Sequence, residues 1–430
     1  MVETFAGFRA AEVAGVPVLW QPDARFKTFR VTLHARRPLG ATAAARSLLP
    51  ALLLQGTARD PDRPALARRM ESLYGAAVLP LSEKQGETHV LRFTLDSVAG
   101  HRVPGQPDLL GDGLALLADL LARPRLAQGG LEAGSFERER RQAADGARAV
   151  FNNKGRWAAQ RALALACDGE PMAIPEHGDI DAIEALTPAQ CEAARRDFLG
   201  RGSMFAVAYG DLREDTVQPR VANFLAELPP RETEPLPPPV EPAPRDRRAA
   251  VERAHLQQSK LVLVFRLPTD VDASTWAKRG LFCSMLGGGP HSRLFREVRE
   301  KLSLAYYAHA TLDRHKGLLT IHIGLDEGAA ERVEEEVRRQ VAQLAAGEFT
   351  DEEFATARLG ILSALQAVDD SIGDRSEFTA RQWVLGHDRT PSQHAELYAS
   401  LERTTIADGA AGLWLDYSYL LAPQTSEGSS

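Results

Sequence analysis

Arg299 and Tyr306 lie seven residues apart in the segment SMLGGGPHSRLFREVREKLSLAYY, residues 284–307, where a glycine-rich turn leads into a helical pattern and then a strand pattern. Both side chains suit the chemistry of a peptide group. A tyrosine hydroxyl can donate a hydrogen bond to an oxyanion, and a guanidinium fork can hold a peptide carbonyl. The spacing alone also fits a structural role, in which Arg299 stabilises a helix end and Tyr306 packs in a sheet.

The order of predicted elements is the same in the two halves of the chain. Alternating apolar residues predict strands, and apolar residues three or four apart predict helices. The first half is predicted to hold a strand at 28–35, helices at 41–55 and 64–75, strands at 76–82 and 88–96, helices at 109–122 and from 135, and a strand at 203–211. The second half is predicted to hold a strand at 260–267, helices at 273–286 and 291–301, strands at 304–313 and 317–326, and helices at 327–345 and from 350.

A proline-rich segment separates the halves. Residues 226–246 read AELPPRETEPLPPPVEPAPRD, and so many prolines hold a chain extended. We therefore expect an N-terminal domain at 1–225, a linker at 226–248 and a C-terminal domain at 249–430. The predicted fold class is α+β, with two homologous domains that each pack helices on one face of a mainly antiparallel sheet.

Composition excludes several classes of protein. The chain has 430 residues, 44% of them hydrophobic, and a formal net charge of −7. No apolar run approaches the roughly 20 residues that span a bilayer, and the N-terminus has no secretory signal pattern, so we expect a cytoplasmic protein with no membrane partner. No basic stripe interleaved with aromatics appears, which argues against nucleic-acid binding. The three cysteines are far apart and not in CxxC spacing, so we expect buried free thiols.

The segment GGGPHSRLFREVREKLSLAYY resembles the C-terminal signature of the pitrilysin/insulinase family of zinc metallopeptidases. The resemblance covers nearly the whole chain. It is strongest to the non-catalytic, YmfF-like bacterial members, through the stretches RFKTFRVTLHARRPL, ALLLQGT, RRMESLYGA and HKGLL. The resemblance implies a duplicated metallopeptidase-like fold with one copy in each half.

In that family, an Arg and a Tyr reach from the second domain toward the peptide bound at the zinc of the first. They map onto Arg299 and Tyr306, which implies substrate orientation and oxyanion support. Gly287, Gly288 and Gly289 lack the Lys of a phosphate-binding loop, so they indicate a tight turn or a close backbone approach that contacts a partner or substrate. The resemblance also places an added peptide strand near residues 82–95.

The zinc motif of the family, HxxEH, is missing from this chain. Counting back from the Gly-Thr pair that follows the motif, Ser47 and Ala51 stand at the histidine positions, and Pro50 stands at the position of the general base. The position of the distal carboxylate ligand falls on or next to Gly146, where Asp145 is the only adjacent carboxylate. The eleven histidines contain no HxxEH, HExxH or HxxxH spacing, so we expect no metal in this chain.

The resemblance and the missing motif together imply an inactive homologue that contributes to metalloendopeptidase activity only with a partner. We expect a heterodimer in which an HxxEH-bearing subunit supplies zinc and the general base, while this chain encloses and orients a peptide substrate. Self-association as a homodimer is also open, because homologous halves can share an interface. The alternative is a catalytically inactive structural or peptide-binding protein with no peptidase partner.

Overall fold

The computed structural model describes residues 2–127, 130–326 and 328–424. The chain divides into two compact units that do not follow its two halves. Unit 1 comprises Met1–Ala147, Glu176–Pro238 and Ala367–Pro391, and unit 2 comprises Arg148–Pro175, Pro239–Gln366 and Ser392–Ser430. Each unit therefore contains one short segment from the opposite half of the sequence.

Unit 1 is built on a seven-stranded sheet with the order β1-β2-β3-β9-β4-β6-β5. Its strands are β1 (Glu3–Phe5), β2 (Phe8–Val13), β3 (Val16–Pro22), β4 (Thr28–Pro38), β5 (Ala77–Gln85), β6 (Thr88–Val98) and β9 (Ser203–Gly210). All pairs are antiparallel except β3 with β9. Strand β5 is an edge strand, which pairs with β6 alone within the described residues.

Helices cover both faces of this sheet. The large core lies on one face, where Leu33, Phe93 and Leu95 of the sheet meet Leu49 and Leu117 of the helices. The helices of unit 1 before the linker are α1 (Ala43–Leu53), α2 (Arg63–Ser72), α3 (Leu109–Ala122), α4 (Ala133–Ala149, its last two residues in unit 2), α6 (Ile180–Glu184), α7 (Pro188–Gly200) and α8 (Glu214–Ala226). A short hairpin, β7 (Leu126–Ala127) and β8 (Gly130–Leu131), precedes α4.

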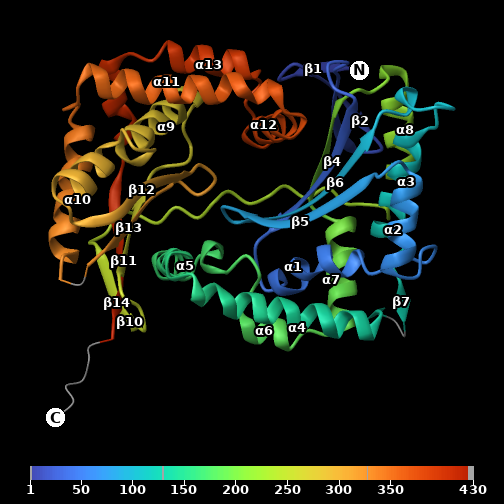
Figure 1. The fold of residues 1–430 in the computed structure, drawn as a ribbon, viewed down its shortest axis with the longest axis horizontal. Coiled ribbons are helices and arrows are strands. Elements are labelled where there is room, and N and C mark those ends of the chain that lie inside the picture. Colours follow the sequence, from blue (N-terminus) through green and yellow to red (C-terminus); the bar gives the residue numbers. More distant parts are fainter. Residues whose placement is uncertain (1, 128–129, 327, 425–430) are drawn as a thin grey trace. The chain divides into compact units, whose positions relative to one another are not determined.

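The other face of the unit 1 sheet is covered by α12 (Ile372–Leu385), which comes from the second half of the chain (Figure 1). Ala380 of α12 joins Phe8, Phe205 and Tyr209 of the sheet in a separate apolar cluster. Arg375 fixes the helix, because its guanidinium donates to the Ala6 carbonyl at 2.7 Å. The helix thus completes a layer that the first half does not supply.

Unit 2 repeats the plan on a five-stranded sheet with the order β10-β14-β11-β13-β12. Its strands are β10 (Arg248–Ala254), β11 (Ser259–Arg266), β12 (Ala305–Asp313), β13 (Leu318–Leu325) and β14 (Trp414–Pro423), and only β10 with β14 is parallel. Helices α9 (Ala273–Gly287), α10 (Ala330–Ala345), α11 (Asp351–Ala367, whose last residue lies in unit 1) and α13 (Pro391–Ala399, whose first residue lies in unit 1) accompany the sheet, with the π-helical turn η4 (Leu294–Lys301).

The main core of unit 2 lies between the sheet and helices such as α9 and α10. Helix α5 (Lys154–Ala166), from the first half of the chain, packs on the other face (Figure 1). Its Ala158, Ala162 and Ala166 are four residues apart, so they form one buried face, which meets Val264 and Tyr419 of the sheet. The exchange of α5 and α12 therefore gives each sheet a second helical layer.

The predicted α+β class with two mainly antiparallel sheets is confirmed, but helices cover both faces of each sheet and not one face as predicted, because α12 and α5 add a second layer. The predicted strands and helices are found close to their expected places, but β1–β3, β7, β8, β10, β14 and α5–α8 had not been predicted. Between Ala226 and Arg248 the described chain forms no helix or strand longer than an isolated bridge, as the prolines predict. No helix among the described residues is long and apolar enough to cross a membrane.

Candidate functional site

Arg299 and Tyr306 flank a sharp reversal in unit 2. The π-helical turn η4 is anchored by the buried Leu294 and Val298. The chain then turns back through Ser303 in the left-handed region at φ 50°, and the Leu304 amide donates to the Val298 carbonyl at 3.0 Å. The turn η4 packs against β12, so Arg299 and Tyr306 belong to one local structure.

Tyr306 occupies a β-bulge at the start of β12. Ala305 pairs with Leu325 and Tyr307 pairs with Gly324, so Tyr306 is the extra residue on its strand. Bulges redirect side chains, and the Tyr306 side chain is 49% exposed. Its hydroxyl donates to Asp326 Oδ1 at 2.7 Å, and this carboxylate raises the pKa of Tyr306.

Arg299 is exposed, with its guanidinium 4.4 Å from the ring centroid of Phe295 one turn earlier. Within the described residues it forms no ion pair. Its five donors are therefore open to a ligand, and the phenyl ring restrains the side chain through a cation–π contact.

The three glycines have different surroundings. Gly287 ends α9 where the helix crosses β12 closely, because an added Cβ would lie 2.4 Å from the Ala310 amide nitrogen. Gly288 has a similar restriction against Ser284 at 2.7 Å, whereas Gly289 has open space. The close approach expected from the sequence is thus present at Gly287, and it serves helix-to-strand packing.

The positions of the zinc motif lie on α1 and α4 in unit 1. Ser47 donates to the Ala44 carbonyl at 2.9 Å and to the His177 carbonyl at 3.3 Å, so its hydroxyl is used within the chain. Pro50 and Ala51 carry no ligand atom, and Gly146 on α4 faces open space. No group of three or more His, Cys, Asp or Glu side chains gathers in the searched part of the chain, so these positions do not fit zinc.

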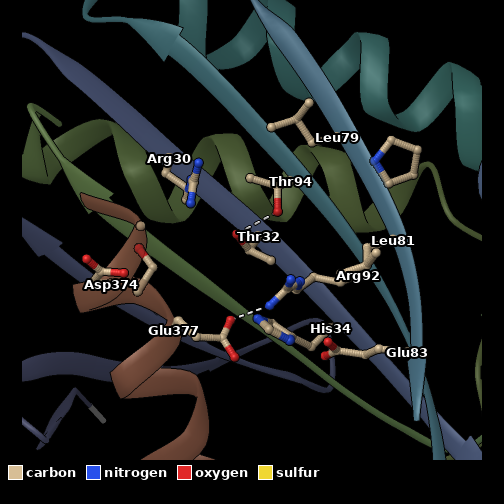
Figure 2. Close-up of a pocket in the computed structure, with 13 residues that line it drawn as sticks. Arg30, Thr32, His34, Leu79, Leu81, Glu83, Arg92, Thr94, Asp374 and Glu377 are labelled. Atoms are coloured by element: carbon tan, nitrogen blue, oxygen red, sulfur yellow. Dashed lines mark hydrogen bonds and ion pairs between the residues drawn. The ribbon is translucent and has the colours of Figure 1, made fainter. Parts of the chain in front are cut away.

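A pocket of about 530 Å³ lies in unit 1 between the edge of the sheet and α12 (Figure 2). Two ion pairs frame it. Arg30 donates to both carboxylate oxygens of Asp96 at 2.6 Å, and Arg92 pairs with Glu377 of α12. Figure 2 shows Arg92 and Glu377 pointing toward each other, which joins the sheet to the helix at this point.

The edge strand β5 supplies the opposite wall of the pocket. Leu79 and Leu81 alternate along it and are 52% and 41% exposed, so both present apolar surface at the pocket. Glu83 follows on the same face, and burial raises the pKa of its carboxyl. Behind them, burial lowers the pKa of His34 to about 3, so its imidazole is neutral at pH 7.

Sequence reasoning had not identified this pocket. Arg92 and Glu377 are 285 positions apart, and no local pattern connects them. The expected peptide-binding region at 82–95 covers only part of the pocket wall. The alternation of Leu79 and Leu81 with Pro80 was visible in the sequence, and proline is tolerated mainly on edge strands, so this signal could have marked β5 as an edge.

Comparison with known proteins supports the resemblance. Residues 185–361 match the family model described as "Peptidase M16 inactive domain". The chain is 27% identical over 415 residues to a Bacillus subtilis (strain 168) protein named "Probable inactive metalloprotease YmfF", which covers 94% of this chain and 95% of that protein. It is 28% identical over 160 residues to an "Uncharacterized zinc protease" of Rickettsia bellii, covering 36% of this chain and 38% of that protein.

Solved structures share the fold over nearly the whole chain. A conserved protein from Enterococcus faecalis V583 superposes with a TM-score of 0.90 at 23% identity, covering 98% of this chain and 100% of that one. A peptidase M16 inactive domain from Pseudomonas fluorescens superposes with a TM-score of 0.82 at 20% identity, covering 98% and 99%. The resemblance seen in the sequence is thus confirmed: the chain resembles the M16 peptidases, that is, the pitrilysin and insulinase family, and is similar over nearly its whole length to a probable inactive metalloprotease.

Proposed function

We propose that this chain is the non-catalytic subunit of a two-chain M16 peptidase, in which it orients peptide for a zinc-bearing partner. The observation that carries the proposal is the contrast between the two motifs. The zinc positions carry no imidazole or carboxylate, whereas Arg299 and Tyr306 match the family's residue types and are exposed with their polar atoms.

The proposed roles follow from what the two side chains can donate. The Tyr306 hydroxyl exchanges its hydrogen bond to the exposed Asp326 for one to the peptide carbonyl oxygen as that atom gains negative charge. The Arg299 guanidinium donates to a neighbouring carbonyl and fixes the backbone. The partner supplies the zinc-bound water and the general base. This chain stabilises the transition state and has no part in activating water.

The test is a reconstitution with a separately purified M16 homologue that carries HxxEH. The pure chain should not cleave a quenched fluorescent peptide, and the mixture should. Tyr306→Phe should then lower kcat of the mixture by about 10²–10³-fold, the effect of removing one oxyanion donor. Arg299→Ala should lower kcat/KM.

Two matched changes control for nonspecific damage. Lys301→Ala removes an exposed cation from the same turn as Arg299, and Tyr74→Phe removes a hydroxyl from a tyrosine that is 52% exposed in unit 1. Both should leave the activity of the mixture unchanged. Full activity of a mixture carrying both Arg299→Ala and Tyr306→Phe would refute the assigned roles.

The second candidate is a peptide-binding protein without a peptidase partner, and the edge strand β5 favours it. A peptide that adds to β5 as a further strand would gain backbone hydrogen bonds and could cover Leu79 and Leu81. Binding of a labelled peptide to the chain alone, weakened by Leu79→Ser with Leu81→Ser, would support this function. Activity that never appears with any HxxEH homologue would favour it over the first.

A further inference from the structure

We propose that unit 2 carries an oxyanion-binding site, which takes a phosphate or carboxylate group in a pocket between α5 and the strands β11, β13 and β12. The pocket has a volume of about 1020 Å³ and is lined wholly by residues of unit 2. The inference is independent of the proposed peptidase role.

The floor of the pocket consists of aromatic rings. His309 of β12 and His322 of β13 stand directly opposite each other across the strand pair, and their rings stack with centroids 4.8 Å apart and planes 17° apart. The Tyr307 ring continues the row, 5.9 Å from that of His309. Gly324 makes room for it, because a Cβ there would lie 2.3 Å from Tyr307 Cε1.

Cationic side chains surround this floor. Lys154 and Arg156 come from the first turn of α5, and Lys260 comes from β11, with its ammonium 5.2 Å from the Tyr307 ring centroid. None of the three forms an ion pair within the part of the chain that the structure describes. No Asp or Glu is among the residues that line the pocket.

The charges around the pocket favour a negatively charged ligand. Three cations without a lining carboxylate attract an anion and repel a metal ion, although two opposed imidazoles alone could suit a metal. Burial lowers the pKa of His309 and of His322, so both imidazoles are neutral at pH 7 and offer hydrogen bonds and a flat surface. Asn152 and Asn153 add uncharged donors at the rim.

Phosphate and carboxylate groups both carry negatively charged oxygens that such cations bind, and the experiment distinguishes a phosphate ligand from a peptide carboxylate. Binding to the full chain is measured by calorimetry with sodium pyrophosphate and with a pair of peptides that differ only in a free or amidated C-terminus. The side-chain resonances of His309 and His322 are followed by NMR. Saturable binding of pyrophosphate that shifts both histidines supports a phosphate source, and preference for the free-acid peptide supports a carboxylate source.

The triple variant Lys154→Gln, Arg156→Gln, Lys260→Gln should weaken binding at least tenfold. Arg332→Gln, an exposed change on α10, serves as the control and should leave binding unchanged. Because all four changes keep the apolar contacts of the cores, thermal unfolding should verify that each variant is folded. The proposal is overturned if no anion binds at millimolar concentration, if the triple variant binds as tightly as the natural chain, or if Zn²⁺ or Ni²⁺ alone shifts the histidines.

Discussion

Replacing Glu170 with alanine should loosen the attachment of α5 to the unit 2 sheet. Glu170 follows α5 in the sequence and is buried against the second half of the chain. Its carboxylate accepts from Arg266 at 2.7 and 3.1 Å and pairs with Lys316 at 2.6 Å. It therefore links the exchanged segment to the unit whose sheet that segment covers.

The loss in the free energy of unfolding depends on the two buried cations that remain after Glu170→Ala. The Lys316 side chain is fully buried, and Arg266 is 5% exposed. Arg266 keeps Asp416 as a partner at 2.6 Å, but the ammonium of Lys316 loses the carboxylate of Glu170. Removing one member of a buried ion pair costs about 3–5 kcal/mol, because the remaining charge stays desolvated. We expect Glu170→Ala to fall in this range.

Urea denaturation measures the total loss, and hydrogen exchange followed by mass spectrometry locates it. Amides of α5 should exchange faster in the variant, whereas those of the α3 region in unit 1 should not. The exposed pair Asp351 with Arg403, 92% and 42% exposed, provides the control in the same unit. Asp351→Ala should cost less than about 1 kcal/mol.

A second substitution tests the cause. If the buried charge of Lys316 without the Glu170 carboxylate is responsible, adding Lys316→Met to Glu170→Ala should restore part of the lost stability, since a buried ion pair can often be replaced by apolar groups. A loss below about 1 kcal/mol with unchanged exchange in α5 would refute the reasoning. So would a double variant less stable than Glu170→Ala alone.

Three further outcomes are expected. Burial lowers the pKa of His34 and of His89 to about 3, so the folded protein is destabilised as the pH falls from about 6.5, where the unfolded chain takes up protons, toward 3. Urea denaturation should therefore give a free energy of unfolding about 2 kcal/mol lower at pH 5 than at pH 7 for each histidine. His89→Gln should remove the part of this pH dependence that is due to His89. Gly287→Ala should lower stability by about 1–3 kcal/mol through overlap with Ala310, measured by thermal unfolding, with Gly289→Ala as a near-neutral control. Dialysis against EDTA should leave the melting temperature of the pure chain unchanged, since its zinc-motif positions offer no imidazole or carboxylate.

The sequence predicted individual elements well because their signals are local. The alternation in TFRVTLHA marks β4, and the proline cluster at 226–246 marks the irregular connection between the halves. The Arg299 and Tyr306 pair was found by its motif. Its surroundings, the bulge and the bond to Asp326, depend on the strand pairing and could not be read from spacing.

The pairing of elements was harder to predict. Helix α5 was not predicted; the alanines at 158, 162 and 166 are typical of a helix with one buried face, but nothing in them tells which sheet that face will meet. No pattern in the sequence had paired His309 with His322. The two histidines lie opposite each other because the hairpin around the turn at 314–317 pairs Asp313 with Leu318. This part of the unit 2 pocket could therefore have been predicted from the sequence.

The exchange of helices also affects the order in which the chain can fold during synthesis. The face of the unit 1 sheet formed by Phe8, Phe205 and Tyr209 is complete once β9 ends at Gly210, but α12, which covers it, ends 175 residues later at Leu385. At about 5–20 residues per second, this aromatic surface stays uncovered for roughly 9 to 35 s on the ribosome. A nascent chain of this fold therefore presents a binding site for chaperones over that interval, and severing it at the prolines would leave two fragments that each lack one layer.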